Sequence, residues 1–280
     1  MFDTIEKIEG AVLRHGKTHS RLYLTQSTEN NWDALIPKMK DLAHKKKYDK
    51  IIGKVPEQAI GVFESNGFHI EAKIPGLYNG NTTGYFLSEY LNDKRRQNDE
   101  QALKTIASVK AIAQAAKSSS EEGYMSLPTN FTVRKLTVND YATLANLHKE
   151  VFKAHSLPIH EEAYLLELAE QSHEFYGLFK EEELIVSTIL HIHEKELNIE
   201  IVDFATHPDY NGQNLSYYLL QEIKKKSDKG AYKTIYALVR ATSYGLNITF
   251  SKHGFHFGGT LYNNTVIRNS LESMNVWYSN

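Results

Sequence analysis

Two short segments of this 280-residue chain share an unusual pattern of residues. Residues 63–69 read Phe-Glu-Ser-Asn-Gly-Phe-His, and residues 250–256 read Phe-Ser-Lys-His-Gly-Phe-His. Each segment follows an expected strand and a short helix, and Leu-Tyr-Asn comes soon after each. Because one order of elements that occurs twice indicates two units of similar fold, we infer that the halves are related. The first half lacks one element, a counterpart of the turn at residues 210–216.

The order of the expected strands and helices places both halves in the α/β class, with a sheet covered by helices. In the first half we expect strands at residues 10–15, 21–25, 50–54, 69–74 and 85–90, and helices at 32–46 and 57–66. In the second half we expect strands at 131–136, 175–179, 184–193, 197–206 and 234–239, two more near the C-terminus, and helices at 140–152, 161–170, 215–226 and 244–252. Between the halves, residues 93–117 predict one long helix, and the polar stretch 118–123 predicts a flexible boundary.

The composition excludes several classes of function. The 32 Lys+Arg against 34 Asp+Glu give a formal net charge of −2, without the strong basic excess of a nucleic-acid binder. The absence of cysteine excludes disulfide frameworks, thiolate zinc sites and cysteine nucleophiles. The first residues carry acids where a signal peptide has a basic start, and no apolar run approaches the roughly 20 residues of a membrane helix. We therefore expect a cytoplasmic protein with no nucleic-acid or membrane partner.

Residues 200–216 carry the strongest indication of a ligand site. An expected strand ends there, a turn with Pro208 follows, and a loop rich in Gly and Asn enters a helix. Free backbone N–H groups and the helix dipole at such a place attract a pyrophosphate. Gly212, Asn214 and Ser216 are small or tolerate a left-handed backbone, so the chain can approach a ligand closely. An ordinary strand–turn–helix connection has the same outline.

The residues at 210–216, Tyr-Asn-Gly-Gln-Asn-Leu-Ser, resemble the acetyl-CoA loop of the GNAT N-acetyltransferases. Asn247, Phe250 and the Gly-Phe pair at 254–255 resemble the next motif of that superfamily. A narrower likeness, to the β-lysine N6-acetyltransferase family, spans nearly the whole chain. Its motifs are residues 74–80, 203–206, 243–250, 258–265 and 271–277.

This resemblance implies a GNAT acyltransferase fold, a mixed central sheet flanked by helices, for residues 130–280. Residues 92–129 then form a helical linker, and residues 1–91 form a degenerate GNAT-like α/β domain that lids the site or braces the core. The implied reaction transfers acetyl from acetyl-CoA to the terminal amine of β-lysine and gives Nε-acetyl-β-lysine, a compatible solute. The implied partner is thus a small-molecule amine. Whether the protein forms a homodimer is left open.

The chain departs from the superfamily pattern at two places. The loop pattern Arg/Gln-x-x-Gly-x-Gly/Ala appears as Asn211-x-x-Asn214-x-Ser216, so the phosphate contacts are expected from backbone N–H groups and amides. Phe250 stands where many members of the superfamily carry a tyrosine that acts as a general acid. That role is therefore vacant, or it is filled by Tyr244 or Tyr262.

An alkylamine acceptor with a pKa of about 10.4 is protonated at neutral pH, so the site must supply a base and exclude bulk water. Glu200 and Asp203 are the candidates. Because they are three residues apart on an expected strand, their side chains should point to opposite faces. Glu200 occupies the position of the glutamate base in several GNAT enzymes, and Asp203 can instead hold an ammonium group or orient a water. A solvated or salt-bridged strand carboxylate is the competing interpretation for either residue.

Arg240 follows the expected strand 234–239, and its guanidinium fork suits the carboxylate of the substrate. Arg134 and Arg268 are reserves, and Tyr262 is a further expected substrate contact. Backbone N–H groups near residues 204–206 are expected to stabilise the thioester oxygen. The expected acetyl-CoA contacts are Phe204, Ala205, Thr206, Asn211, Gly212, Gln213, Asn214, Leu215, Ser216, Asn247 and Phe250.

His191 and His193 fall on one face of an expected strand, a spacing that can chelate a metal. No third ligand is apparent near them in the sequence, so we expect a histidine pair at the edge of the core and no metal. Two other interpretations stay open for the whole chain. One is an acetyltransferase for another small amine, such as lysine or a polyamine, and the other is a CoA-binding regulatory protein without catalysis.

Overall fold

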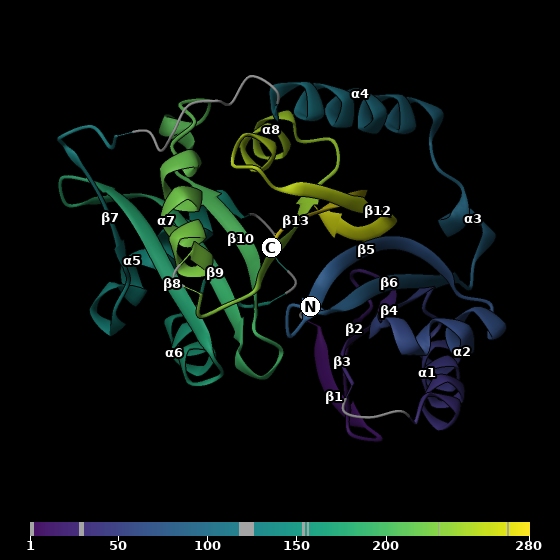
Figure 1. Ribbon diagram of the computed structural model, residues 1–280. Coiled ribbons are helices and arrows are strands. Elements are labelled where there is room, and N and C mark those ends of the chain that lie inside the picture. The colour runs from purple at the N-terminus through teal and green to yellow at the C-terminus, as the bar shows by residue number, and fades with distance from the viewer. Residues whose placement is uncertain are drawn as a thin grey trace.

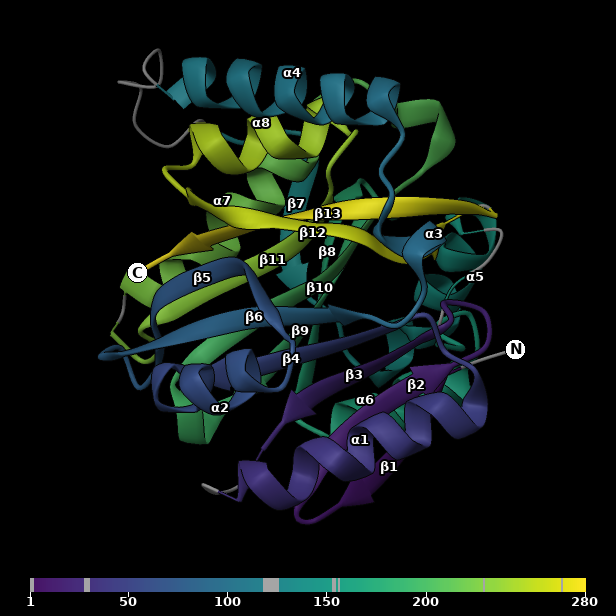
Figure 2. The same ribbon diagram turned by 90° about the vertical axis from the view of Figure 1, so that its right-hand side faces the viewer.

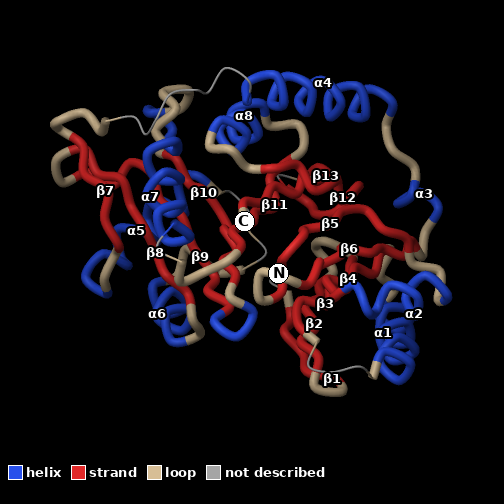
Figure 3. The backbone as a smooth tube through the Cα atoms, in the orientation of Figure 1, coloured by secondary structure: helices blue, strands red, loops and turns tan. Residues whose placement is uncertain are grey.

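The computed structural model describes residues 3–27, 31–117, 126–152, 155, 157–228, 230–267 and 269–280. Over these ranges the strands form one mixed 13-stranded sheet in the order β1-β2-β3-β4-β6-β5-β12-β13-β11-β10-β9-β8-β7. The strands run without a break from one half of the chain to the other (Figure 3). None of the helices in these ranges combines the length and the apolar character that a bilayer span requires.

The first half supplies one end of the sheet, β1-β2-β3-β4-β6-β5, in which β3 and β4 are parallel. Trp32, Leu35, Ile36, Met39 and Ala43 recur at helical spacing and form the buried stripe of its long helix. Both helices lie on the side that faces away from the second half (Figure 1). Its elements are β1 (Thr4–Ile8), β2 (Ala11–Gly16), β3 (Arg21–Gln26), α1 (Trp32–Lys46), β4 (Lys50–Pro56), α2 (Ile60–Ser65), β5 (His69–Tyr78) and β6 (Thr82–Tyr90).

The second half continues the sheet and adds helices on both of its faces. One buried cluster packs α7 and α8 against the sheet, and another packs α5 and α6 against the opposite face. Its elements are β7 (Phe131–Lys135), α5 (Tyr141–Val151), α6 (Glu162–Glu170), β8 (His173–Lys180), β9 (Glu183–His193), β10 (Asn198–Thr206), α7 (Ser216–Asp228), β11 (Thr234–Arg240), α8 (Tyr244–Lys252), β12 (His256–Ile267) and β13 (Ser270–Ser279).

The two halves share one order of strands. Without β7, the second half reads β8-β9-β10-β11-β13-β12, which matches β1-β2-β3-β4-β6-β5 strand for strand. In each half a helix joins the parallel pair, α1 between β3 and β4 and α7 between β10 and β11. This agreement supports the inferred relation. The expectation that the first half lacks only one element was wrong, because β7, α5 and α6 also have no counterpart in its described residues.

The halves meet where β5 and β12 pair antiparallel, with Gly259 opposite Ala72. The backbones are so close there that a Cβ on Gly259 would lie 2.3 Å from the Glu71 carbonyl oxygen. A Cβ on Gly258 would lie 2.6 Å from the Lys73 carbonyl oxygen. The two adjacent glycines therefore permit the close approach of the strands that joins the halves.

The two half-sheets also share a buried core beside this junction. Tyr23 and Ile52 of the first half pack in one cluster with Tyr236, Leu261 and Val276 of the second. Along β3, β4 and β11 the neighbouring residues point the other way, toward the helices of their own half. Each half-sheet thus buries one face under its own helices and part of its other face against its sibling.

The connection between the halves differs from the single helix that we expected at residues 93–117. It forms α3 (Asp93–Arg96) and α4 (Glu100–Lys117). The break occurs because Asp99 caps a new helix, its carboxylate accepting the N–H of Ala102 at 2.8 Å. Arg95 in α3 is buried and donates to the carbonyl oxygens of His19 and Asn263, so the short helix links both halves.

Helix α4 lies along α8 (Figure 2). Its buried stripe consists of Ile106, Val109 and Ala113. The expected flexible stretch at 118–123 lies entirely outside the described residues, which resume at residue 126. The expected domain limits at residues 91 and 129 stay a prediction.

Replacing Gly259 by alanine is expected to lower the free energy of unfolding by about 3 kcal/mol, because the new Cβ would overlap the backbone of β5 and the residue has φ near +145°. Gly245→Ala in α8 is the matched control, since its Cβ would have no atom within 4 Å. That change should leave stability equal or raise it by about 0.5–1 kcal/mol. Urea unfolding checks both, and equal stability of the two variants would contradict the account of the junction.

Candidate active site

The candidate site is built on β10, at the point where this strand leaves its parallel neighbour. β10 pairs with β11 only from Asn198 opposite Thr234 to Ile201 opposite Ala237. Beyond that point β11 stays paired with β13, and β10 stays paired with β9 as far as Thr206. The backbone groups of residues 202–206 on the side of β11 are therefore without a strand partner. An extended ligand with amide groups can use such an edge as a strand would.

A β-bulge lies at the same point of β10. Ile201 is opposite Leu190 and Asp203 is opposite Ile189, so Val202 is one extra residue on β10. An inserted residue bends the strand and shifts the alternation of all side chains beyond it. The bulge therefore decides which side chains face the site.

Because of this bulge, Glu200 and Asp203 lie on the same face of the sheet. Ile199 before the bulge and Phe204 after it pack on the α7 and α8 side, whereas Ala205 packs on the α5 and α6 side. Side chains alternate along a strand, so both carboxylates face away from α7. The sequence-based prediction that they point to opposite faces was wrong, because it assumed a regular strand.

Glu200 is the centre of a polar cluster between the halves. The Tyr236 hydroxyl donates to Glu200 Oε2 at 2.8 Å, and Lys54 Nζ donates to the Tyr236 hydroxyl oxygen at 2.9 Å. His193 Nε2 lies 3.7 Å from the same Oε2. Burial alone would raise the pKa of the Glu200 carboxyl, but His193 and the charge of Lys54 outweigh burial and lower it. Glu200 is thus held as an anion and is a weak base.

Asp203 has the opposite electrostatic surroundings. Burial raises the pKa of its carboxyl, and His148 and the Ile189 N–H offset this only in part. The Ile189 N–H donates to Oδ1 at 3.0 Å, while the buried Oδ2 has no hydrogen-bond partner among the described residues. Of the two carboxylates, Asp203 is therefore the better proton acceptor.

His148 of α5 stands behind Asp203 and is fully buried. Its Nδ1 lies 2.9 Å from the Ile159 carbonyl oxygen, which fixes the proton on Nδ1 when the ring is neutral. Its Nε2 is 3.2 Å from Ser187 Oγ and 3.8 Å from Asp203 Oδ2. A proton on Asp203 Oδ2 would therefore lie close to the unprotonated Nε2 of His148.

The loop between β10 and α7 has the backbone expected for a phosphate site. Gly212 has φ +81° and Asn214 has φ +55°, both in the left-handed region that the sequence indicated. The backbone amides of residues 212–215 donate to no group of the described residues. Leu215 is buried and anchors the start of α7, whose N-terminus begins at Ser216. These features fit the pyrophosphate of acetyl-CoA.

Two of the expected acetyl-CoA residues have structural roles. Asn247 is fully buried and uses all of its hydrogen-bonding groups inside the protein. Its amide donates to the Arg240 and Ser243 carbonyl oxygens, and its side-chain oxygen accepts from Asn275 and Trp277.

Phe250 is likewise fully buried, where it packs against Phe204 and Phe255. Neither side chain exposes a group, and the cofactor contact of Asn247 and Phe250 stays a prediction. Packing fixes these two positions of the family motif.

The two tyrosines that we considered as general acids are bound elsewhere. The Tyr244 hydroxyl donates to Ser108 Oγ of α4 at 3.2 Å, on the opposite side of the sheet from Glu200. The backbone of Tyr262 is held by Lys50 and Glu71 at the junction of the halves. Neither has a recorded contact with a site carboxylate.

The three arginine candidates for the substrate carboxylate differ in their surroundings. Arg240 is half-buried and follows Tyr236 at an even spacing on β11, so it shares the face of that residue. Arg134 forms a two-point ion pair with Asp140, at 2.7 and 2.8 Å, and is occupied. Arg268 lies outside the described residues.

The structure supplies a third potential metal ligand that we did not expect. Potential ligand atoms of His191, His193 and Glu200 lie within 4.8 Å of one another. Pairing of β9 with β10 sets Glu200 opposite His191, a relation that no sequence motif reveals. Such a set suits zinc, but the Lys54 ammonium, one Tyr236 hydroxyl away from the carboxylate, opposes a dication.

Sequence reasoning missed the contribution of the first half to this site. Lys54 comes from β4, and Gln26 Nε2 at the end of β3 lies 3.4 Å from His193 Nδ1. One signal was present, since Lys54 interrupts the apolar run that surrounds it in the strand. A buried strand that contains a lysine indicates a placed charge.

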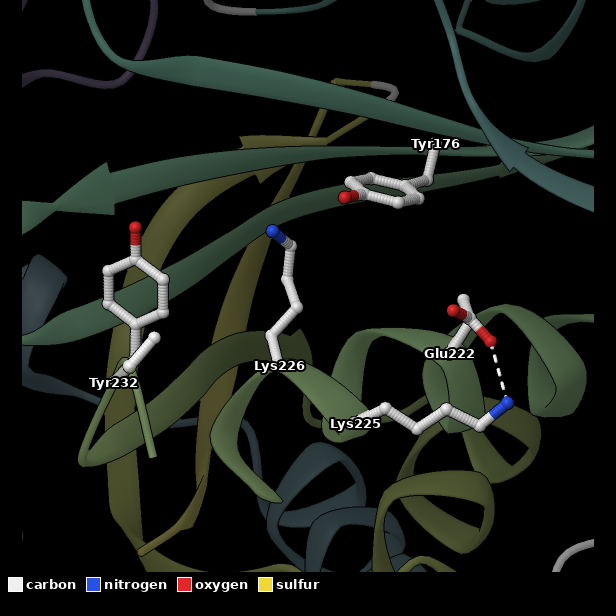
Figure 4. Close-up of a pocket in the computed structure, with 6 residues that line it drawn as sticks. Tyr176, Glu222, Lys225, Lys226 and Tyr232 are labelled. Carbon is white, nitrogen blue, oxygen red and sulfur yellow. Dashed lines mark hydrogen bonds and ion pairs between the residues drawn. The ribbon is translucent and has the colours of Figure 1, made fainter. Parts of the chain in front are cut away.

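A pocket at the other end of α7 is separate from this site. It has a volume of about 210 Å³ and is lined by Tyr176, Glu222, Lys225, Lys226, Ala231 and Tyr232 (Figure 4). Its charges are paired, since Lys225 meets Glu222 and Lys226 meets Glu174, each at 2.8 Å. It lies at the C-terminal end of the helix, whereas the loop with free amides precedes the N-terminal end.

Comparison with known proteins identifies the superfamily. Residues 141–255 match the model of the acetyltransferase (GNAT) family and form a GNAT acetyltransferase domain. The matched residues include both carboxylates and the loop before α7. The chain is therefore an acetyl-CoA-dependent N-acetyltransferase, and the expected GNAT fold, a mixed sheet flanked by helices, is confirmed.

Three curated relatives are similar to this chain. A β-lysine N(6)-acetyltransferase of Methanococcus maripaludis is 25% identical over 276 residues, which cover 99% of this chain and 98% of that protein. The N-acetyltransferase YodP of Bacillus subtilis is 27% identical over 95% of this chain and 94% of its own. A β-lysine N(6)-acetyltransferase of Methanosarcina mazei is 30% identical over 54% of this chain and 56% of its own.

The surroundings of the two carboxylates predict different kinetic effects when each residue is replaced by its amide. Asp203→Asn should lower kcat by about 10²- to 10⁴-fold, because it removes the better base, and should leave the KM for acetyl-CoA unchanged. Glu200→Gln should raise the KM for the amine more than it lowers kcat. Steady-state kinetics check both, and a reversal of the two patterns would contradict the assignment.

The pH profile of the wild type provides a further measurement. Since burial raises the pKa of Asp203 above that of an ordinary aspartate, the acid limb of kcat/KM should lie above the pH at which such a residue titrates. The ionised form is the active one, so activity is lost as the pH falls through this raised pKa. An acid limb at or below about pH 3.9, the ordinary value, would argue against Asp203 as the base.

Proposed function

We propose that the protein transfers the acetyl group of acetyl-CoA to the terminal amine of β-lysine and forms Nε-acetyl-β-lysine. The similarity over nearly the full length to a β-lysine N(6)-acetyltransferase carries this proposal. It includes the first half, which lies outside the matched GNAT domain. The product would serve as a compatible solute, made in the cytoplasm.

The spacing of the two site carboxylates supports a diamine acceptor. Glu200 and Asp203 are opposite His191 and Ile189, two residues apart on β9, so their positions are about 6.8 Å apart along the strand. The amines of β-lysine stand on C3 and C6, and five bonds between them span about 6 Å when extended. In this proposal Glu200 holds the β-ammonium group while the terminal amine reaches Asp203.

The reaction requires that the terminal ammonium lose a proton before its nitrogen attacks the thioester carbonyl carbon. Asp203 receives that proton, and His148 lies behind it to share the charge. The N–H groups on the free edge of β10, near residues 204–206, stabilise the negative charge on the carbonyl oxygen. Acetyl-CoA, when bound, supplies the acetyl group, and its sulfur leaves as a thiolate. A separate general acid is not required, because a thiol with a pKa near 8.5 is an adequate leaving group.

The expected result with purified protein is release of CoA in the presence of β-lysine, with the acetyl group on the terminal nitrogen. Mass spectrometry and NMR of the product locate the acetyl group. α-Lysine, whose amines are separated by one more carbon, should give a kcat/KM at least about tenfold lower, as a misplaced reacting amine loses orientation. Turnover of α-lysine or a polyamine with none of β-lysine would refute the proposed acceptor.

A further inference from the structure

Lys54 is a buried cation whose hydrogen-bonding capacity is only partly used. It is 2% exposed, and its one recorded hydrogen bond is the 2.9 Å contact with the Tyr236 hydroxyl. An ammonium group has three donors, and its burial without an anionic partner is costly. In the described residues no carboxylate oxygen lies within 4.0 Å of its Nζ. The local structure of β4 alone does not explain this cost.

Lys50, on the same strand and the same face, provides a direct comparison. It is also fully buried, but its Nζ donates to Glu71 at 2.8 Å, to the Tyr262 carbonyl oxygen at 2.7 Å and to the Tyr90 hydroxyl at 3.2 Å. All three of its donors are thus satisfied within the protein. The difference between the two lysines indicates that Lys54 retains donors for something that the chain itself does not provide.

The position of Lys54 relative to Glu200 indicates what that partner is. The Tyr236 hydroxyl lies between them, 2.9 Å from the ammonium nitrogen and 2.8 Å from the carboxylate oxygen. A buried cation and a half-buried anion therefore stand one hydroxyl group apart, where residues of the two halves meet. A zwitterion with an ammonium group and a carboxylate on nearby carbons has charges that complement this pair: its ammonium group can meet Glu200 and its carboxylate can meet Lys54.

We infer that Lys54 of the first half binds the carboxylate of the acceptor, so that both halves together form the acceptor site. This rests on the proposed function and assigns the β-ammonium group to Glu200 and the terminal amine to Asp203. It also replaces Arg240 as the carboxylate contact, since Arg240 lies four residues farther along β11 than Tyr236, with which Lys54 is in contact. The first half thereby acts in the recognition of the substrate.

Putrescine separates this role from a general effect on the site, because it has the two amines of β-lysine at the same spacing and no carboxylate. Lys54→Gln should raise the KM for β-lysine by about 10- to 100-fold, the effect of a lost charged hydrogen bond. The KM or competitive inhibition constant of putrescine should change by less than about twofold. Lys54→Arg, which keeps the charge, should recover part of the affinity for β-lysine.

Each alternative gives a different result in the same experiment. If Lys54 only keeps Glu200 ionised, Lys54→Gln will weaken both acceptors equally, which overturns the inference. If Arg240 binds the carboxylate, Arg240→Gln will show the selective loss and Lys54→Gln will not, which also overturns it. Thermal melting and the KM for acetyl-CoA report on the fold of each variant. Failure of the wild type to acetylate β-lysine would instead refute the proposed function itself.

Discussion

One extra residue in one strand determines the geometry of the candidate site. Val202 bulges from β10 at the point where β10 and β11 stop pairing. The parting of the strands frees a backbone edge, and the bulge turns Glu200 and Asp203 to the same face. The loop that follows then places free amides at the start of α7. The proposed acetyl-CoA site and the proposed acceptor site are therefore neighbours on a single strand.

The two halves of the chain have the same strand order but contribute differently to this site. The second half carries the loop, the two carboxylates and the helices α5 and α6. The described residues of the first half contain no counterpart of these elements, but its Lys54 and Gln26 lie on the face of the sheet that carries Glu200. Gly258 and Gly259 allow the backbones of the halves to approach closely enough for a shared core. In our proposal the first half, whose described residues include no such loop, forms one wall of the acceptor site.

The sequence was sufficient for most of the fold, because periodicity and turn residues determine elements such as α1, which has the expected limits of residues 32–46. The repeated heptapeptide indicated the relation of the halves. The strand β1 and the break at Asp99 were missed, since β1 is short and exposed and a capping aspartate inside a helix-forming stretch looks ordinary. Local sequence patterns do not report these features.

The candidate site was less predictable than the fold, for physical reasons that differ among its residues. Glu200, Asp203 and the loop at 211–216 follow from the family motif. The two carboxylates share a face because of a β-bulge, and no sequence pattern marks the position of that bulge. Asn247 and Phe250 belong to the motif but are explained by packing. Lys54 reaches the site only through long-range strand pairing, so neither spacing nor motif could place it there.

A crystal structure of the protein with CoA and β-lysine would test the central claim most directly. The account predicts the terminal nitrogen of β-lysine within hydrogen-bonding distance of Asp203, and the β-ammonium group next to Glu200. The carboxylate should contact Lys54, with the CoA sulfur beside residues 202–204. An acceptor bound away from the interface of the halves, or with its carboxylate on Arg240, would contradict the account.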